Sequence, residues 1–220
     1  HHYSVKQDCH FKSSLFQFLD REQLSGSFPN FRLQRSDSEL SFDLNIQTTQ
    51  LISHFTQMRF SLADHWSLLC HCQGTVNYKA QQYTIDGLGS FEYARSFNFS
   101  YLPLAFLTYQ IINLSENRQL LLAQIRDGFN RIVQSRIYLR DLKNMRTQMF
   151  DRKVYFKVHR VYPCVTTPNR QSMYLPREFE WCYENADGTC IWVQGQSRGD
   201  FKFGLAAGYV GSFSYEVKIN

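Results

Sequence analysis

The sequence contains no long apolar run. No stretch approaches the roughly 20 consecutive apolar residues that a membrane-spanning helix needs. The first residues, 1–4, also lack the apolar core of a signal peptide. We therefore predict neither a membrane-spanning helix nor an export signal within these residues, although a signal removed before His1 would leave no trace here. A cytoplasmic location is favoured on these grounds and because the cysteines are interpreted as free thiols.

Motifs that would define a reaction are also missing. The chain has neither a P-loop nor a dinucleotide-binding fingerprint. The segment 195–199 only mimics a nucleophile elbow, and we do not assign it as one. Cys70 and Cys72 are one residue too close for a zinc-binding pair, and neither His71 nor His159 has a partner at ligand spacing. We predict no metal site and no cofactor, and we interpret both histidines as structural.

The six cysteines are too few and too scattered to indicate a disulfide framework in a chain of this length. Three disulfides are conceivable in an oxidising compartment, but buried free thiols are the preferred interpretation. Cys182 and Cys190 flank an apparent hairpin, so they are the pair to test for a cross-strand bridge.

Aromatic residues are abundant, with 19 Phe and 13 Tyr, and they favour half-buried strands. Apolar residues alternate with polar ones over 40–46, which predicts a strand paired with the run around Phe31 and Leu33. The even positions of 66–78 form one apolar face, and a bend or bulge is expected near Gly74. Helix signals are thin and limited to 14–24 and to 139–150, which is as easily a loop. We predict an all-β fold of antiparallel strands with few short helices.

A near-repeat indicates the domain organisation. Residues 72–78 reappear as residues 209–215, an offset of 137 positions, which suggests two copies of one β unit. After the first copy, residues 84–93 form an expected closing strand, whereas the second copy ends near Asn220. We predict a first domain over 1–100, which could lack its own start, and a second domain over 101–220 that lacks its last strand.

Three segments resemble a known group of bacterial proteins. They are Gly87-Leu88-Gly89-Ser90-Phe91-Glu92-Tyr93, Thr167-Pro168-Asn169-Arg170 with Leu175-Pro176 and Trp181, and Gly204-Leu205-Ala206-Ala207-Gly208-Tyr209. They are similar to the carotenoid 1,2-hydratase (hydroxyneurosporene synthase) group and its uncharacterised relatives, which have tandem lipocalin-like architecture. The resemblance implies two adjacent antiparallel β-barrels of about eight strands each, whose interiors or mutual interface hold an apolar ligand.

The same resemblance suggests candidate catalytic residues. Ala63-Asp64-His65-Trp66 resembles an Asp-His-aromatic segment of the hydratase-like relatives, although the glycine that follows there is replaced here by Ser67-Leu68. Asp64 would be the proton donor and His65 the relay; alternatively, Asp64 accepts turn hydrogen bonds and His65 faces water. Glu92 is the second carboxylate. It would be functional if its face lined a barrel lumen, and would pair with Arg95 if that face met solvent.

Several aromatic or polar residues are candidates for ligand contacts. These are Trp66, His71, Tyr93, Trp181, Trp192 and Tyr209. Residues 118–160 hold eleven Arg or Lys against three Asp, a local charge of +8, while the rest of the chain carries −3. Such a region could contact anionic membranes peripherally or simply face solvent, and nucleic acid is the least favoured partner. The oligomeric state is not indicated by the sequence.

Three functions follow from these patterns. The first is a lipocalin-like protein that binds a hydrophobic small molecule, such as a fatty acid or isoprenoid, in a β-barrel pocket. The second is a hydratase or cyclase that uses a buried carboxylate as general acid on an isoprenoid-like substrate. The third is an interaction module that uses its basic face. Whether the protein is an enzyme is left open by the sequence, and the first function is preferred because it requires only the fold.

Overall fold

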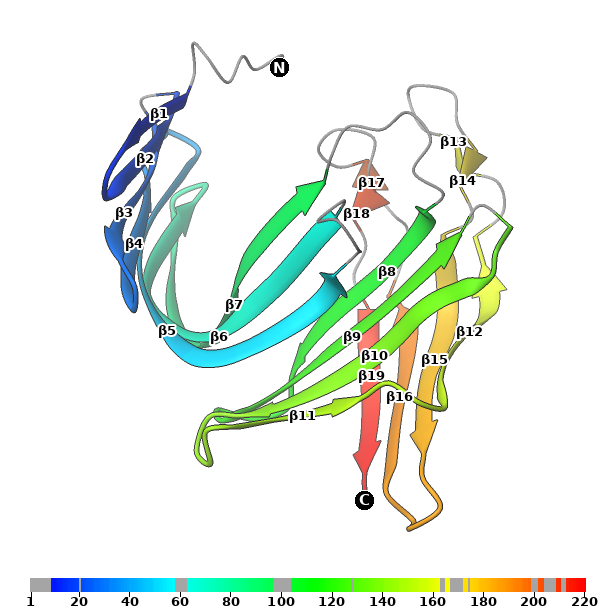
Figure 1. Cartoon of the computed structure of the whole chain (residues 1–220). Coiled ribbons are helices and arrows are strands. Elements are labelled where there is room, and N and C mark those ends of the chain that lie inside the picture. The colour runs from blue at the N-terminus through cyan, green and yellow to red at the C-terminus, as the bar shows by residue number, and fades with distance from the viewer. Residues whose placement is uncertain are drawn as a thin grey trace. The chain divides into compact units, whose positions relative to one another are not determined.

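The structure is a computed structural model built from β-strands and turns (Figure 1). It describes residues 9–19, 21–57, 63–96, 104–127, 129–162, 165–166, 172–173, 175–198, 202–203, 209–210 and 213–220. No helix occurs in these ranges, so none that could cross a membrane is found there. The predicted all-β fold class is confirmed.

The chain forms two compact units. The first comprises His1–Leu102, Gln110–Leu121 and Tyr138–Gln148, and the second comprises Pro103–Tyr109, Leu122–Ile137 and Met149–Asn220. The two units alternate along the middle of the sequence. Each unit is assembled from several segments, so the units do not correspond to a single cut in the sequence. The domain boundaries expected from the sequence, 1–100 and 101–220, stay a prediction.

The first unit contains a sheet of seven antiparallel strands that follow one another in chain order. They are β1 (Cys9–Lys12), β2 (Leu15–Phe18), β3 (Glu22–Ser27), β4 (Asn30–Arg35), β5 (Leu40–Gln57), β6 (Ala63–Tyr78) and β7 (Gln81–Ser96). The predicted pairing of the Phe31 region with 40–46 is confirmed, since Phe31 lies opposite Ile46. Lys79 and Ala80, with φ of 46° and 63°, form a tight two-residue turn between β6 and β7.

The seven-stranded sheet curls, as the bend of β5 in Figure 1 illustrates. The rings of Phe31 on β4 and Phe91 on β7 stack with centroids 4.7 Å apart, although two strands separate them in the sheet. We call the face that carries both rings the inner face, and the opposite face the outer face. The register irregularities lie in β5, between Thr48 and Ile52 and between His54 and Thr56. The register is regular at Gly74, which lies opposite Leu44, so the bulge expected there is not found.

The outer face of this sheet is also buried over part of its area. Leu51, Leu69 and Leu88 form a core cluster on β5, β6 and β7, and Leu142 packs against it. Ser53 and Ser67 on the same face have no exposed surface. The alternation in the sequence predicted only one apolar face for β6. The second buried face arises from tertiary packing, which periodicity alone does not report.

A second sheet has the strand order β11-β10-β9-β8. Its strands are β8 (Leu104–Asn113), β9 (Arg118–Asp127), β10 (Ile132–Asp141) and β11 (Arg146–Phe150). Every residue of β9 from Gln119 to Ile125 is buried, so both faces of this strand are covered. All four strands contain residues of both units, since unit boundaries fall at Gln110, Leu122, Tyr138 and Met149.

The second unit contains an antiparallel sheet with the order β12-β15-β16-β19. Its strands are β12 (Val154–Val161), β15 (Pro176–Glu184), β16 (Cys190–Ser197) and β19 (Phe213–Ile219). Two further pairs of short strands are β13 (Val165–Thr166) with β14 (Ser172–Met173), and β17 (Lys202–Phe203) with β18 (Tyr209–Val210). Burial alternates along β15 and β16, and Phe179, Trp181, Ile191 and Val193 form the buried side. The predicted hairpin at 185–188 is confirmed, with Gly188 at φ +88°.

Close packing at Gly195 yields a first testable prediction. The ring of Phe179, its partner across the β15–β16 ladder, occupies the space that a Cβ at this position would need. Gly195→Ala should therefore lower the free energy of unfolding by about 1–3 kcal/mol, the usual cost of overpacking a core. Urea unfolding would measure it. Gly87→Ala is the control, because a Cβ there meets nothing within 4 Å; equal stability of the two variants would contradict the packing argument.

The helix expected over 14–24 is wrong, because these residues contain the β2–β3 hairpin, in which Phe16 lies opposite Leu24. Residues 139–150, for which a helix and a loop were both open, are the end of β10, a turn and β11. In both cases cross-strand pairing overrides a spacing that also fits a helix. Closed barrels are not found among the described residues either, since each sheet there has two edge strands. The second repeat copy passes through residues 211 and 212, which lie outside the described part.

Candidate functional site

A chain of polar side chains on the outer face of β6 and β7 is the candidate site. Strand alternation places His65 and Ser67 on this face, and the register sets Ser67 opposite Glu92. His65 Nε2 lies 3.3 Å from Glu92 Oε2. Ser90 Oγ, two residues before Glu92 on the same face, donates a hydrogen bond of 2.9 Å to Glu92 Oε1. The carboxylate of Glu92 therefore contacts an imidazole and a hydroxyl at once.

Arg140 on β10 extends this chain into the interior. Its side chain has no exposed surface. The guanidinium donates to Ser67 Oγ at 3.0 Å, to Ser90 Oγ at 3.3 Å and to Gln119 Oε1 at 2.5 Å. The hydroxyls of Ser67 and Ser90 also share a short hydrogen bond. We call Gln119, Arg140, Ser67, Ser90, Glu92 and His65 the arginine network.

The arginine network explains how a guanidinium can be buried here. An isolated buried charge is costly unless hydrogen bonds or an opposite charge compensate it. Serine and glutamine oxygens accept hydrogen bonds from the guanidinium, and Ser90 links it to the Glu92 carboxylate. At the outer end, the side chains of His65 and Glu92 keep 15% and 30% of their surface exposed. The network thus joins a buried cation to a solvent-accessible imidazole–carboxylate pair, which is suited to holding or passing a proton.

The sheet separates one of the three predicted catalytic residues, Asp64, from the other two. His65 and Glu92 meet, whereas Asp64 is half-buried and lies on the opposite face of β6, in register with Arg95. The face of Glu92 is the outer face and not the inner one. The side chain of Arg95, the expected partner of Glu92, lies outside the described side chains. His65 packs against Phe55, with centroids 4.7 Å apart, so it is only partly hydrated.

The predicted ligand contacts do not form one cluster. In the first unit, Trp66 and Tyr93 stack with centroids 5.3 Å apart on the inner face, and His71 Nε2 lies 3.0 Å from Asp86 Oδ1 on the outer face. In the second unit, Trp181 is fully buried in the core. Trp192 lies on the opposite face of that sheet, beneath the Lys218 ammonium at 4.9 Å. Tyr209 belongs to β18, and its side chain lies outside the described ones.

The inner face of the first unit carries half-buried apolar residues and two glycines. Phe31, Ile46, Leu68 and Phe91 are all half-buried on it. Gly87 lies opposite Cys72, and a Cβ built there would meet no atom within 4 Å. The space above β7 at this point is therefore open. The role of this position could not be predicted from the sequence, where Gly87 resembles any turn or packing glycine.

Cys70 on the inner face supplies a second testable prediction. Burial, and then the neighbouring Cys72, raise the pKa of the Cys70 thiol to about 11, while Arg140 acts in the opposite direction. A pKa raised in the folded state means that stability is full below about pH 9 and falls as the pH rises towards 11. At pH 8, alkylation of Cys70 by iodoacetamide should be about 100-fold slower than for a thiol of ordinary pKa. Peptide mapping would measure the rate; rapid labelling of folded protein would contradict it.

Other sequence candidates have structural roles. The described cysteines Cys9, Cys70, Cys72, Cys182 and Cys190 are free, and Cys182 faces Trp192 rather than Cys190. Ser197 of the elbow-like segment lies in the β16–β19 ladder opposite Phe213, and its hydroxyl contacts Tyr162 Oη at 2.8 Å. A nucleophile elbow requires a turn from strand to helix, so this segment is not one. Within the described ranges, no group of three potential metal ligands occurs.

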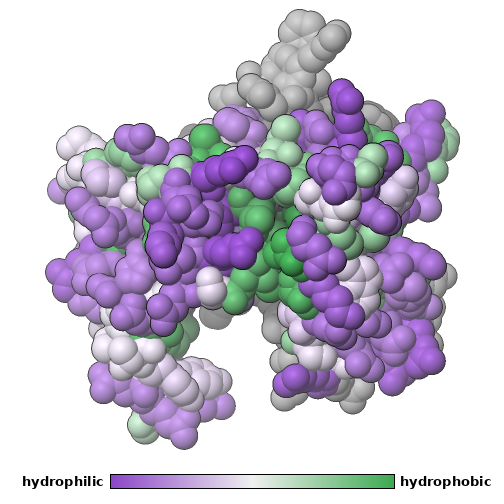
Figure 2. Space-filling model, turned by 90° about the horizontal axis from the view of Figure 1, so that it is seen from below, coloured by the Kyte–Doolittle hydropathy of each residue, from purple (hydrophilic) through white to green (hydrophobic). Residues whose placement is uncertain are grey.

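The basic region 118–160 does not belong to one unit. Arg118, Arg140, Lys143 and Arg146 fall in the first unit, and the remaining basic residues fall in the second. Arg140 is withdrawn from the surface altogether. Hydrophilic residues cover most of the face of the molecule shown in Figure 2, as expected for a hydrated exterior. Sequence reasoning counted Arg140 with the surface charges, and its position beside Ile137 and Tyr138 was the available sign of burial.

Comparison with known proteins identifies the family. A profile for a family of unknown function, DUF6670, matches residues 1–220. The chain belongs to the DUF6670 family. No curated protein matches it in sequence. A crystal structure of a Nitrosomonas europaea protein with the provisional name AttH matches with a TM-score of 0.68 and 13% identity, covering 98% of this chain and 69% of that one. This likeness supports the lipocalin-like fold of the DUF6670 chain, and the more specific resemblance to carotenoid hydratases is not reproduced.

Proposed function

We propose that this DUF6670 protein binds a hydrophobic small molecule, such as a fatty acid or isoprenoid, on the inner face of its seven-stranded sheet. The open space above Gly87 is the observation that carries the proposal. It adjoins Cys72 and lies on the face that also holds Phe31, Ile46 and Phe91, so a ligand there would meet apolar side chains. Apolar lining with few polar groups is typical of sites for small hydrophobic ligands.

The lipocalin-like fold is consistent with this function but does not establish it, because one fold supports many functions. Two features of the inner face favour ligand binding over simple core packing. Gly87 provides space, and Trp66 and Tyr93 add a stacked aromatic pair whose tyrosine remains exposed. The ligand class follows from the apolar and aromatic chemistry of these side chains.

The test is a pair of leucine substitutions on β7. Gly87→Leu places a side chain in the open space, whereas Thr84→Leu adds one to the opposite face of the same strand, where Thr84 is exposed. Titration with the fluorescent fatty acid cis-parinaric acid should show saturable binding that Gly87→Leu weakens at least about tenfold and Thr84→Leu preserves. Equal affinity of the two variants, or no saturable binding by the unmodified protein, would overturn the proposal.

The second candidate is a hydratase-type enzyme, which the contact between His65 and Glu92 favours. It ranks second because this pair lies on the outer face, away from the apolar inner face. Extraction and mass spectrometry of co-purified lipid would name a substrate to assay. Glu92→Gln should then abolish hydration while binding is retained, and Asp64→Asn serves as control. Equal turnover by both variants would remove Glu92 from the mechanism.

A further inference from the structure

A polar pocket of about 400 Å³ lies in the first unit, over strands β2 to β6. Its volume is in the range of small-molecule sites. The lining contains seven neutral polar residues, four charged residues and one aromatic residue. They are Gln17, Gln23, Gln34, Ser36, Ser41, Thr75 and Asn77, then Arg21, Glu22, Arg35 and Asp43, and finally Phe42. Such a lining does not suit the hydrophobic ligand proposed above, so this pocket requires a ligand of different chemistry.

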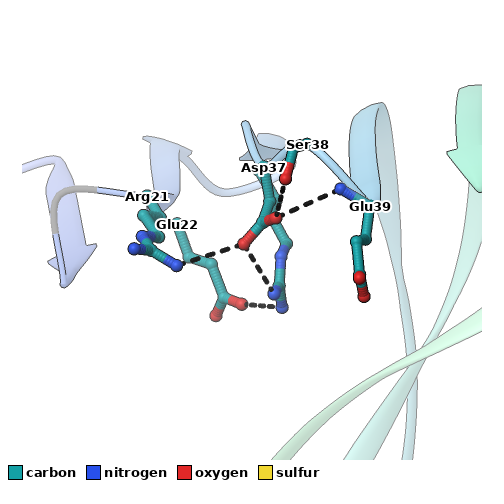
Figure 3. A network of polar contacts seen from close by, with 6 residues as sticks. Arg21, Glu22, Asp37, Ser38 and Glu39 are labelled. Atoms are coloured by element: carbon teal, nitrogen blue, oxygen red, sulfur yellow. Dashed lines mark hydrogen bonds and ion pairs between the residues drawn. The ribbon is translucent and has the colours of Figure 1, made fainter.

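The charges of the pocket are compensated within the protein. Arg35 pairs with Glu22 at 2.6 Å, and Arg21 pairs with Asp37 at 3.2 Å. Figure 3 shows the Arg21 side chain directed at the Asp37 carboxylate. Asp43 is held by Arg32 at 2.5 Å. Hydrogen bonding from Arg32 lowers the pKa of Asp43, and the backbone N–H of Glu39 lowers that of Asp37, so both carboxylates are ionised at neutral pH. No net charge is left to recruit an ion, and the pocket therefore selects a neutral ligand.

The neutral groups form an ordered surface of donors and acceptors. Strand register places Gln23, Gln34 and Asp43 side by side, and Gln23 Nε2 donates to Gln34 Oε1 at 2.6 Å. Gln34 Nε2 in turn donates to Asp43 Oδ2 at 3.2 Å. On the neighbouring strands, Asn77 Nδ2 donates to Ser41 Oγ at 3.2 Å. These bonds fix the amides in place, so little side-chain freedom would be lost on binding.

We propose that this pocket binds a neutral saccharide. Sugar hydroxyls both donate and accept hydrogen bonds, and amide, hydroxyl and ion-paired carboxylate groups can satisfy both roles. This site is independent of the proposed hydrophobic ligand, since its lining residues do not include Gly87 or Phe91.

The experiment uses two tryptophan substitutions in the turn between β4 and β5. Ser36 lines the pocket and is exposed, so Ser36→Trp should block the pocket without disturbing the sheet. Ser38 is exposed in the same turn and does not line it, so Ser38→Trp is the matched control. Saturation-transfer NMR with glucose, galactose, N-acetylglucosamine and cellobiose should detect saturable binding by the full chain, with a Kd of about 1 mM or tighter for at least one sugar.

Binding that Ser36→Trp weakens at least about tenfold, and Ser38→Trp leaves unchanged, would support the proposal. A second variant, Gln34→Leu, removes an amide and should also weaken binding, while Gln148→Leu at an exposed position of β11 should not. The proposal is overturned if no sugar binds saturably, if both tryptophan variants bind equally, or if glucose 6-phosphate or linear sorbitol binds more tightly than every sugar. Binding of cis-parinaric acid is measured separately, so either proposal can fail alone.

Discussion

Replacing Arg140 with alanine should lower the free energy of unfolding by about 3–5 kcal/mol, because it combines a cavity with buried acceptors that lose their donor. The side chain is fully buried, and its guanidinium is the hydrogen-bond donor for Gln119 and Ser67. Arg140→Met refills much of the volume but restores no donor, so it should cost less than alanine and still destabilise the protein. Urea unfolding would measure the changes, with agreement between fluorescence and circular dichroism as the test of two-state behaviour.

The control for Arg140 is Arg146→Ala, at an exposed position of β11 in the same unit. It should change stability by no more than about 0.5 kcal/mol. The methionine variant separates the effect of the lost side-chain volume from the effect of the lost hydrogen-bond donor. Buried charges can be replaced by apolar groups at no cost in some proteins. If Arg140→Met is as stable as the unmodified chain, the arginine network makes no net contribution to folding and its retention would have to be explained by function.

Trp181→Ala should lower the free energy of unfolding by a similar amount, about 3–5 kcal/mol, through a cavity in the second unit. Trp181 has no exposed surface, and its ring lies 4.6 Å from that of Phe156. Phe156, and behind it Phe179, would then border an empty space in this core. The measurement is urea unfolding together with native-state hydrogen exchange, which should show the lost protection in β12, β15 and β16.

Trp192→Ala is the matched control for Trp181, since it removes a tryptophan from the other face of the same sheet. Trp192 is half-buried and its ring packs under the Lys218 ammonium, so its removal should lower the free energy of unfolding by about 1 kcal/mol. If the two alanine variants were equally stable, the buried face of this sheet would not be the main source of stability in the second unit. Protection lost mainly in β5 to β7 would contradict the assignment of Trp181 to that unit.

Much of the fold follows from local patterns in the sequence. The alternation over 40–46 and 66–78 and the turn residues at 185–188 each correspond to observed elements. The errors occur where local patterns are ambiguous. Residues 14–24 fit a helix or a hairpin equally well, and only the pairing of Gln17 with Gln23 and of Phe16 with Leu24 distinguishes them. Such pairing depends on the rest of the sheet, which a short window does not contain.

The candidate sites were harder to predict than the fold. His65 and Glu92 were both selected from the sequence, but their contact depends on the register between β6 and β7. Arg140 was counted as a surface charge, because a basic residue in a strand is usually solvated. The polar pocket combines side chains from five strands, and no spacing in the sequence connects Gln17 with Thr75. Sites of this kind are products of tertiary structure.

The turn at Lys79 and Ala80 has a consequence that reaches far along the chain. Because side chains alternate between the faces of a strand, adding a single residue to this two-residue connection would shift β7 by one position and exchange its faces. Glu92 would then lie opposite Trp66 on the inner face, Phe91 would lie opposite Ser67 on the outer face, and Gly87 and Gly89 would leave the inner face. The turn thus sets the register of β6 against β7. Both the contact between His65 and Glu92 and the space above Gly87 depend on a dipeptide that lies far from either.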